Sequence, residues 1–304
     1  MHADKKLQAE LISKSCQKLG EINFQKNNWT DAERFFRKSK HIYTEIGNKE
    51  GIATTENSLG ILFVEQGKFV PGERYFKSSL QKAEQINHEL LIAKINDNLG
   101  NVATIRGEYE KSISYYNKSL EIAGKENNFQ LMAQIHHNLG MAYKSMGDLD
   151  RASFHFDQSI NYSDMIGNLR LKGLSYLEKA EIHNRKSEFG STTALAITAF
   201  RIFSEIGDYL SLADTYKLFG MVNREKQNWQ LAESYFRNSL KINEDLKNHL
   251  NMGETYFELA VLYKKRGLVN RAKENFEKSA SHFKKANATA KLSLVEEEIR
   301  NLAK

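Results

Sequence analysis

The sequence predicts an all-α protein, a solenoid of seven antiparallel helix-pair repeats followed by a C-terminal capping helix. Two observations lead to this prediction: a small residue recurs every 40 residues, and turn-forming residues recur between the apolar stretches. Self-similarity at a fixed period in this range is typical of solenoids. The in-phase pairs are Leu19-Gly20, Leu59-Gly60, Leu99-Gly100, Leu139-Gly140, Lys179-Ala180, Phe219-Gly220 and Leu259-Ala260.

Other positions keep the same phase. A second small residue lies 12 residues after the first and a third lies 19 after it, at Ser39 and its equivalents. Small residues are expected where two helices approach closely, and a large aromatic residue where a gap must be filled. The aromatic position lies 16 residues after the first small residue and is occupied by Phe36, Phe76, Tyr116, Phe156, Ala196, Phe236 and Phe276.

Turn signals divide each repeat into two helices of roughly 17 residues. Gly or Asn stands at almost every expected turn, and the one proline, Pro71, falls in the first turn of a helix, where proline is tolerated. We expect one solenoid domain over residues 1–304. Its repeats are expected at approximately 8–47, 48–87, 88–127, 128–167, 168–207, 208–247 and 248–287, with the capping helix at approximately 288–304.

Two parts of this scheme differ from the rest. In the final segment five apolar residues are expected on one face of a helix that has no following partner, which predicts a cap; the alternative is an amphipathic segment that binds a membrane or a partner. These residues are Leu292, Leu294, Val295, Ile299 and Leu302. The fifth repeat carries Ala180 and Ala196 at the small and aromatic positions. Two interpretations stay open for it: drift with local repacking, or a unit adapted for bending or binding.

The landmarks together resemble the tetratricopeptide repeat family over nearly the whole chain. The 40-residue unit is longer than the common form and is similar to the repeats of spindle-orientation scaffolds and bacterial signalling arrays. The resemblance implies a right-handed superhelix in which the first helix of each repeat lines a concave groove. It specifies the fold more closely than the function, because this fold serves many partners.

Composition and motifs argue against catalysis. The sequence has no phosphate-binding glycine loop, no His-Glu-x-x-His motif and a single cysteine, Cys16, so we expect no catalytic residues, no cofactor and no metal. The adjacent His136 and His137 would point about 100° apart on a helix and chelate one ion poorly. No apolar run is long enough for a membrane span, and we expect a cytoplasmic protein.

Polar residues on the first helices are the expected binding residues. An asparagine amide can both donate to and accept from an extended peptide backbone, and Lys or Arg can pair with acidic side chains of a partner. The carboxylate clamp of chaperone-tail-binding relatives is not reproduced. The expected peptide-binding residues are Asn57, Lys94, Asn98, Asn101, His137, Asn138, Met141, Lys144, Arg185, Lys217 and Arg224.

Three functions follow in order of preference. The first is a non-catalytic scaffold that binds a peptide segment of a partner in the groove, and the second is a regulatory or sensor module of a bacterial signalling system. The third is nucleic-acid binding, because residues 264–304 carry eleven Lys and Arg against five Asp and Glu, which accounts for the whole net charge of +6. The sequence leaves the oligomeric state open.

Overall fold

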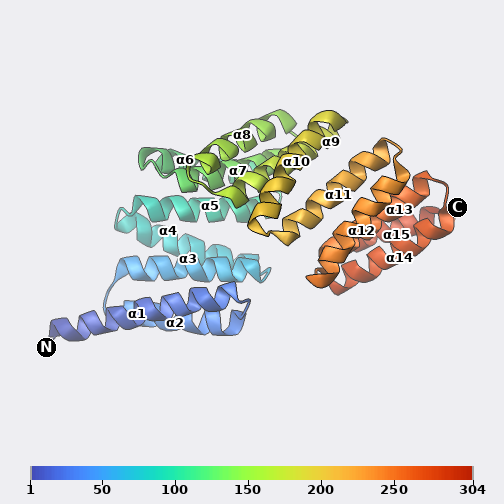
Figure 1. Ribbon diagram of the computed structural model, residues 1–304. Coiled ribbons are helices and arrows are strands. Elements are labelled where there is room, and N and C mark those ends of the chain that lie inside the picture. Colours follow the sequence, from blue (N-terminus) through green and yellow to red (C-terminus); the bar gives the residue numbers. More distant parts are fainter. Residues whose placement is uncertain (1, 303–304) are drawn as a thin grey trace. The chain divides into compact units, whose positions relative to one another are not determined.

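The computed structural model describes residues 2–302, and that part of the chain consists of helices joined by short turns, without a strand (Figure 1). The helices are α1 (His2–Gln25), α2 (Trp29–Glu45), α3 (Lys49–Glu65), α4 (Phe69–Gln85), α5 (Glu89–Ile105), α6 (Tyr109–Lys125), α7 (Phe129–Met146), α8 (Leu149–Met165), α9 (Leu169–Arg185), α10 (Phe189–Ile206), α11 (Tyr209–Glu225), α12 (Trp229–Asp245), α13 (His249–Lys265), α14 (Val269–Lys285) and α15 (Thr289–Leu302).

The turns repeat as regularly as the helices. Every turn contains one residue with φ near +50 to +85°, and these residues stand 20 positions apart from Asn27 to Asn287. In a representative turn the amide of Gly67 donates to the Val64 carbonyl and the amide of Lys68 to the Phe63 carbonyl, both at 2.8 Å, which satisfies carbonyls at the end of α3. The left-handed residue is Gly at half of these turns and a larger residue at the other half.

Gln227 occupies one of these left-handed positions with φ of 61°. A side chain in this conformation brings Cβ close to the backbone and costs roughly 1–2 kcal/mol relative to Gly, although Gly also loses more backbone entropy on folding. We therefore expect Gln227→Gly to raise the free energy of unfolding by about 0.5–1 kcal/mol. Urea denaturation followed by circular dichroism measures it. Gly207→Gln, the reverse change at an equivalent turn, is the control and should destabilise.

The helices pack in the order in which they follow one another. Contacts divide the chain into two compact units, Met1–His155 and Phe156–Lys304. Odd-numbered helices pack against the even-numbered helices before and after them, as α3 does with α2 and α4 and α11 with α10 and α12. Consecutive odd-numbered helices also touch, α3 with α5 and α5 with α7 in the first unit, and α9 with α11 and α11 with α13 in the second. The odd-numbered helices therefore form the more closely spaced inner layer of each unit. The all-helical fold of helix pairs is confirmed.

The recurring glycine lets the two helices of a repeat meet. A Cβ atom added to Gly60 would lie 2.5 Å from the ring of Phe76, and Gly100 and Gly220 stand in the same relation to Tyr116 and Phe236. The buried aromatic residue thus occupies the space that a side chain on the first helix would take. This contact explains why the small residue and the aromatic residue recur together 16 positions apart.

The fifth repeat keeps this principle with the aromatic residue displaced. Ala180 and Ala196 are both fully buried, and Phe203, about two helical turns after Ala196, is the buried ring of this helix pair. A different glycine contacts this ring, because a Cβ on Gly173 would lie 2.7 Å from Phe203. The seventh repeat uses the same second pairing between Gly253 and Phe283. The departure seen in the sequence is thus a complementary repacking.

A buried ion-pair cluster links three helices of the first unit. Glu56 of α3 is buried and accepts from Lys40 of α2 at 2.7 Å and from Lys82 of α4 at 2.9 Å. The Ser78 hydroxyl donates to the same carboxylate at 2.8 Å. Burial alone would raise the pKa of Glu56, but the hydrogen bonds from Lys40, Lys82 and Ser78 outweigh it and lower the pKa.

The last helix closes the second unit. Val295 of α15 is fully buried and packs in one cluster with Phe276 and Phe283 of α14. Ser293 and Arg300 lie on exposed positions of the same helix. Arg300 stands at the position where each repeat has Gly or Ala. A large side chain fits there because no second helix follows among the described residues. A helix, α15, lies where the capping helix is predicted.

Candidate functional site

Five of the expected binding residues line one hollow of about 410 Å³ in the first unit. They lie on the inner helices α5 and α7, because residues 40 apart occupy the same face of successive first helices. A hollow of this size can hold one or two side chains of a ligand. The five residues are Asn98, Asn101, His137, Asn138 and Met141.

The rest of the lining is mainly apolar. Ile61 and Val64 of α3, Phe76 of α4 and Ile105 of α5 contribute side chains to it, and Phe76 is almost fully buried whereas Ile105 is exposed. Glu65 is the one acidic residue of the lining. The hollow therefore offers an apolar surface bordered by amides, a combination that suits an uncharged side chain next to a peptide backbone.

A buried carboxylate fixes the direction of one amide. The Asn138 amide nitrogen donates to Asp97 Oδ1 at 2.9 Å, and Gln134 donates to Asp97 Oδ2 at 3.3 Å. Because an ionised carboxylate only accepts, the amide nitrogen of Asn138 must face Asp97, and its oxygen faces away. Asn138, a lining residue of the hollow, is therefore left with its amide oxygen as an acceptor.

Two more amides are held by neighbouring side chains. Asn98 Nδ2 donates to Asn57 Oδ1 at 2.9 Å, and the Tyr116 hydroxyl donates to Asn101 Oδ1 at 2.6 Å. Asn98 is thus left with an oxygen for a ligand and Asn101 with an amide nitrogen. Acceptors and donors on one surface match the alternating groups of an extended peptide backbone.

Burial shifts the pKa values of two ionisable side chains near the hollow, Asp97 and His137. Burial raises the pKa of Asp97 to about 6, against which the hydrogen bond from Asn138 acts. Burial, with a smaller contribution from the charge of Lys144, lowers the pKa of His137 to about 4. His137 is therefore neutral at pH 7. Asp97 is ionised at that pH but has almost no contact with solvent.

The other expected binding residues lie in different environments. Asn57 is not part of the lining but accepts a hydrogen bond from Asn98. Lys94 and Arg185 are exposed, whereas Lys144 is buried and close enough to His137 to affect its pKa.

Two of the three expected basic residues of the second unit, Lys217 and Arg224, are already matched by acids. Lys217 of α11 contacts Asp214 at 3.1 Å and Glu254 of α13 at 2.5 Å. Burial alone would lower the pKa of Lys217, but these carboxylates outweigh it and raise the pKa. Arg224 likewise pairs with Glu258 at 2.5 Å. Both cations therefore hold α11 to α13, and a partner would have to compete for them.

A spacing rule could have found these pairs. Neighbouring first helices bring together residues 37 apart, as in Asp97 with Gln134 and Lys217 with Glu254. They also bring together residues 41 apart, as in Asp97 with Asn138. Applied to the sequence, this rule predicts which polar residues of the inner layer already have partners.

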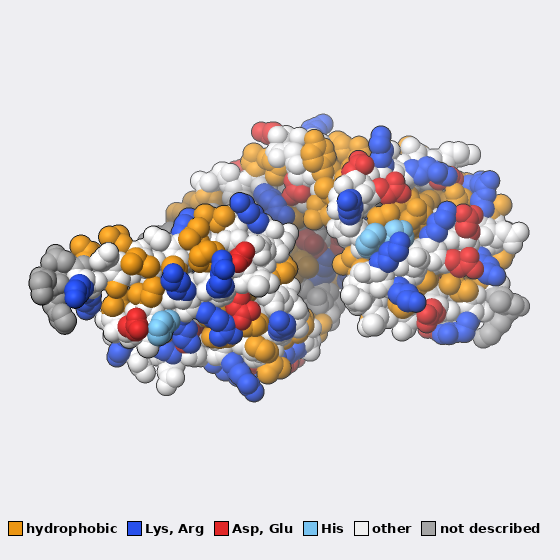
Figure 2. Space-filling model, turned by 90° about the horizontal axis from the view of Figure 1, so that it is seen from below, with side chains coloured by type: hydrophobic (Ala, Val, Ile, Leu, Met, Phe, Trp, Pro, Cys, Tyr) orange, Lys and Arg blue, Asp and Glu red, His pale blue; other side chains and the backbone are white. Residues whose placement is uncertain are grey.

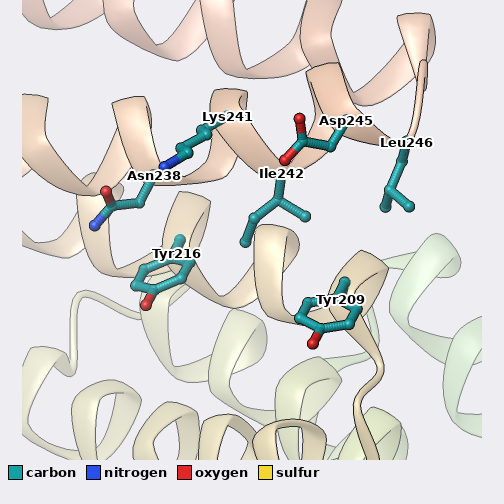
Figure 3. A pocket seen from close by; sticks show the side chains of 7 residues that line it. All are labelled: Tyr209, Tyr216, Asn238, Lys241, Ile242, Asp245 and Leu246. Carbon is teal, nitrogen blue, oxygen red and sulfur yellow. The ribbon is translucent and has the colours of Figure 1, made fainter.

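A second hollow, of about 480 Å³, lies in the second unit and contains none of the expected residues. Figure 3 shows Tyr209 and Tyr216 of α11 across from Ile242 and Leu246, with the charged ends of side chains on α12 nearby. Its lining consists of Tyr209, Tyr216, Asn238, Lys241, Ile242, Asp245 and Leu246. Sequence reasoning missed it, because most tyrosines of the repeats stand at positions that indicate core residues.

Several basic residues of the C-terminal region are also paired. Lys264 contacts Glu298 at 2.7 Å, Lys265 contacts Glu225 at 2.5 Å, and Lys291 contacts Glu254. Part of the local basic excess is thus neutralised within the second unit. Across residues 2–302 no group of three or more His, Cys, Asp or Glu side chains is arranged to hold a metal. None of the described helices combines the length and apolar character of a membrane span.

The tetratricopeptide repeat model matches residues 91–163 and 211–285. These matches show tetratricopeptide repeats in two regions of the chain, and the described helices continue the same helix-pair fold beyond them. No curated protein matches it in sequence.

Solved structures of the same fold include the apo form of RapI, at 15 % identity and a TM-score of 0.74, with 91 % of this chain and 99 % of that chain covered. A Rap protein complexed with competence and sporulation factor has 11 % identity, a TM-score of 0.64 and coverage of 99 % and 98 %. A signal transduction ATPase with a tetratricopeptide repeat sensor from Pyrococcus horikoshii has 16 % identity and a TM-score of 0.71, with 93 % of this chain and 44 % of that chain covered. At these identities the likeness shows the fold alone.

Proposed function

We propose that the chain is a non-catalytic regulatory module that binds a peptide segment in the hollow of its first unit. The observation that carries the proposal is the arrangement of three oriented amides, Asn98, Asn101 and Asn138, beside an apolar surface. Such a surface can hold the backbone of an extended peptide and bury one of its side chains. The amides and apolar side chains of this surface are suited to binding a ligand.

The one charged residue of the lining, Glu65, favours a neutral or basic peptide at this position. The nearest acidic groups are Glu65 in the lining and the buried Asp97, and His137 is uncharged at pH 7 because of its lowered pKa. The acidic partner side chains suggested by the sequence would instead meet the exposed Lys94, away from the lining of the hollow.

The structural neighbours support a regulatory role over a purely architectural one. One is a Rap conjugation gene regulator in complex with the Phr* peptide, at 15 % identity and a TM-score of 0.70, and another is the apo form of the quorum sensor NprR, at 15 % identity and a TM-score of 0.63. By analogy of fold, the first unit would sense a peptide and the chain would act on a further protein in a bacterial signalling system. Nucleic-acid binding is a weaker proposal, because Lys264, Lys265 and Lys291 are paired with acids.

The proposal is tested with a library of end-capped hexapeptides selected on the purified chain. We expect the selected peptides to share one apolar residue. Their affinity should fall about tenfold or more in Ile105→Glu, because a buried ligand side chain would then face a charge. Ile105 is 57 % exposed, so the substitution should leave the fold intact.

Val70→Glu is the matched control. Val70 is 56 % exposed on α4 and is not part of the lining, so its replacement should leave the affinity unchanged. Selected peptides that bind Ile105→Glu as tightly as the wild type would refute the hollow as the site. Salt-sensitive binding of a DNA or RNA oligomer in place of peptides would favour the nucleic-acid alternative.

A further inference from the structure

One face of α1 is exposed where the equivalent face of later first helices is buried. Leu19 is 42 % exposed and Ile22 is 38 % exposed. The residues 40, 80 and 120 positions later are 0–2 % exposed at both places. These buried equivalents are Leu59, Leu99 and Leu139 for Leu19, and Leu62, Val102 and Ala142 for Ile22.

The cover in later repeats is the second helix of the preceding repeat. Phe36 of α2 packs in one cluster with Leu59 and Leu62 of α3, and α4 covers the same face of α5. No described helix covers this face of α1. Figure 2 looks onto this end of the chain and shows hydrophobic side chains gathered along the helix next to its N-terminus.

The exposed side chains form a stripe with internal symmetry. We call Leu7, Leu11, Ser15, Leu19 and Ile22 the α1 stripe; its four apolar members are all exposed, Leu7 and Leu11 by more than half. The spacings of four, four, four and three residues place them along one ridge of the helix. The apolar residues lie at nearly equal distances on either side of Ser15, the smallest member.

We propose that the α1 stripe is a homodimer interface, in which α1 packs antiparallel against α1 of a second copy. In this arrangement Leu11 meets Leu19 of the partner subunit, and Leu7 meets Ile22 of the partner subunit. The two Ser15 residues meet on the two-fold axis, where a small residue allows close helix approach. A self-complementary patch of this kind closes at two copies.

The charges beside the stripe do not oppose this pairing. Lys14 pairs with Glu10 at 2.9 Å and Lys18 pairs with Glu21 at 3.0 Å, both within α1. The flank of the stripe therefore carries no net charge from these four residues.

End-to-end stacking of α1 on the last helix fits less well. The side of α15 where a further second helix would pack presents polar and charged residues, and Arg300 stands at the position that Gly or Ala occupies in every repeat. Ser293, Glu296, Glu297 and Arg300 are all exposed. An apolar stripe gains nothing from that surface, and such stacking would continue as a filament.

The oligomeric state of the full chain tests the proposal. Sedimentation equilibrium between about 1 and 200 µM should show a monomer–dimer equilibrium for the wild type. Leu19→Glu should raise the dissociation constant about 100-fold, because it places a charge in the centre of an apolar contact. Leu294→Glu is the matched control: Leu294 is exposed on α15, so this change should leave the dimer intact. Circular dichroism verifies that both variants fold.

A cysteine at the symmetry axis gives an independent test. Ser15→Cys should form a disulfide-linked dimer under mild oxidation, because the proposed arrangement brings residue 15 next to its copy. The wild type is the control, since its own Cys16 is buried and should not crosslink. A monomer at 200 µM, a dimer unaffected by Leu19→Glu, a dimer lost in Leu294→Glu, or no crosslink through residue 15 would each overturn the proposal.

Discussion

Replacing Glu56 by alanine is expected to lower the free energy of unfolding by about 2–3 kcal/mol. Removal of one partner of a buried ion pair typically costs about 3–5 kcal/mol, because the other charge is left without compensation. Here Lys40 and Lys82 are 33 % and 29 % exposed, so water can partly replace the lost carboxylate and the cost falls below that range. Urea denaturation at pH 7 measures the change.

An exposed ion pair supplies the control for Glu56. Glu121 pairs with Lys125 within α6 at 2.7 Å, and both side chains are more than two-thirds exposed. Glu121→Ala should leave the stability nearly unchanged, because water screens an exposed pair of this kind. Equal losses in the two variants would show that the buried cluster has no special role.

The Glu56 effect should also depend on pH. Its folded pKa is lowered, so its stabilising contribution is fully present above the unfolded pKa of about 4.3 and is lost as the pH falls through the folded pKa. The difference in stability between the wild type and Glu56→Ala should therefore be largest at neutral pH and shrink below about pH 4.

Asp97→Asn should act in the opposite direction and stabilise the first unit at pH 7 by about 2–3 kcal/mol. Burial raises the folded pKa of Asp97 to about 6, compared with about 3.9 in an unfolded chain, and a pKa difference of 1 corresponds to about 1.4 kcal/mol. The new asparagine can still accept from Asn138, and the Gln134 amide can turn to accept from it. Thermal or urea unfolding measures the gain.

The gain from Asp97→Asn should vary with pH. A folded pKa above the unfolded one means that the folded state binds the proton more tightly, so stability is higher below about pH 4 and falls as the pH rises to about 6. The gain should thus appear between pH 4 and 6 and remain above that range. Asp245→Asn, at an exposed position of α12, is the control and should change the stability little. A destabilised Asp97→Asn variant would contradict the burial argument.

Burying the Asp97 carboxylate costs stability, which suggests that this residue serves a function. A carboxylate kept in a costly environment often serves a function. Here it holds the Asn138 amide nitrogen and leaves the amide oxygen as the acceptor for a ligand. The Asp97→Asn variant should therefore bind the selected peptides less tightly although it is more stable, since an asparagine at position 97 allows the Asn138 amide to turn over.

The helices and turns were predictable from the sequence because each obeys a local rule. Ser187 shows this clearly: it is neither Gly nor Asn, yet the period predicts a turn there, and it adopts φ of 59°. The packing of the fifth repeat was harder to predict, since Ala196 stands where the other repeats have an aromatic residue. Its compensation by Phe203 and Gly173 depends on a contact between two helices.

The binding residues were predicted less evenly, for a physical reason. Asn98, Asn101 and Asn138 were placed together because they share a helix face at a fixed period, and they line one hollow. Lys217 and Arg224 were expected to meet a partner for the same reason. Their acidic neighbours Glu254 and Glu258 come from the next inner helix, and a pattern within one repeat does not reveal that contact.

The uniform turns restrict how this protein can acquire new partners. Many binding proteins change specificity by lengthening or shortening surface loops. Here the residues between successive helices number only two or three, and each turn holds a left-handed residue in a fixed place. An inserted residue would rotate the following helix relative to its neighbours. Recognition is therefore encoded in helical side chains, and it can diverge by point substitution one repeat at a time.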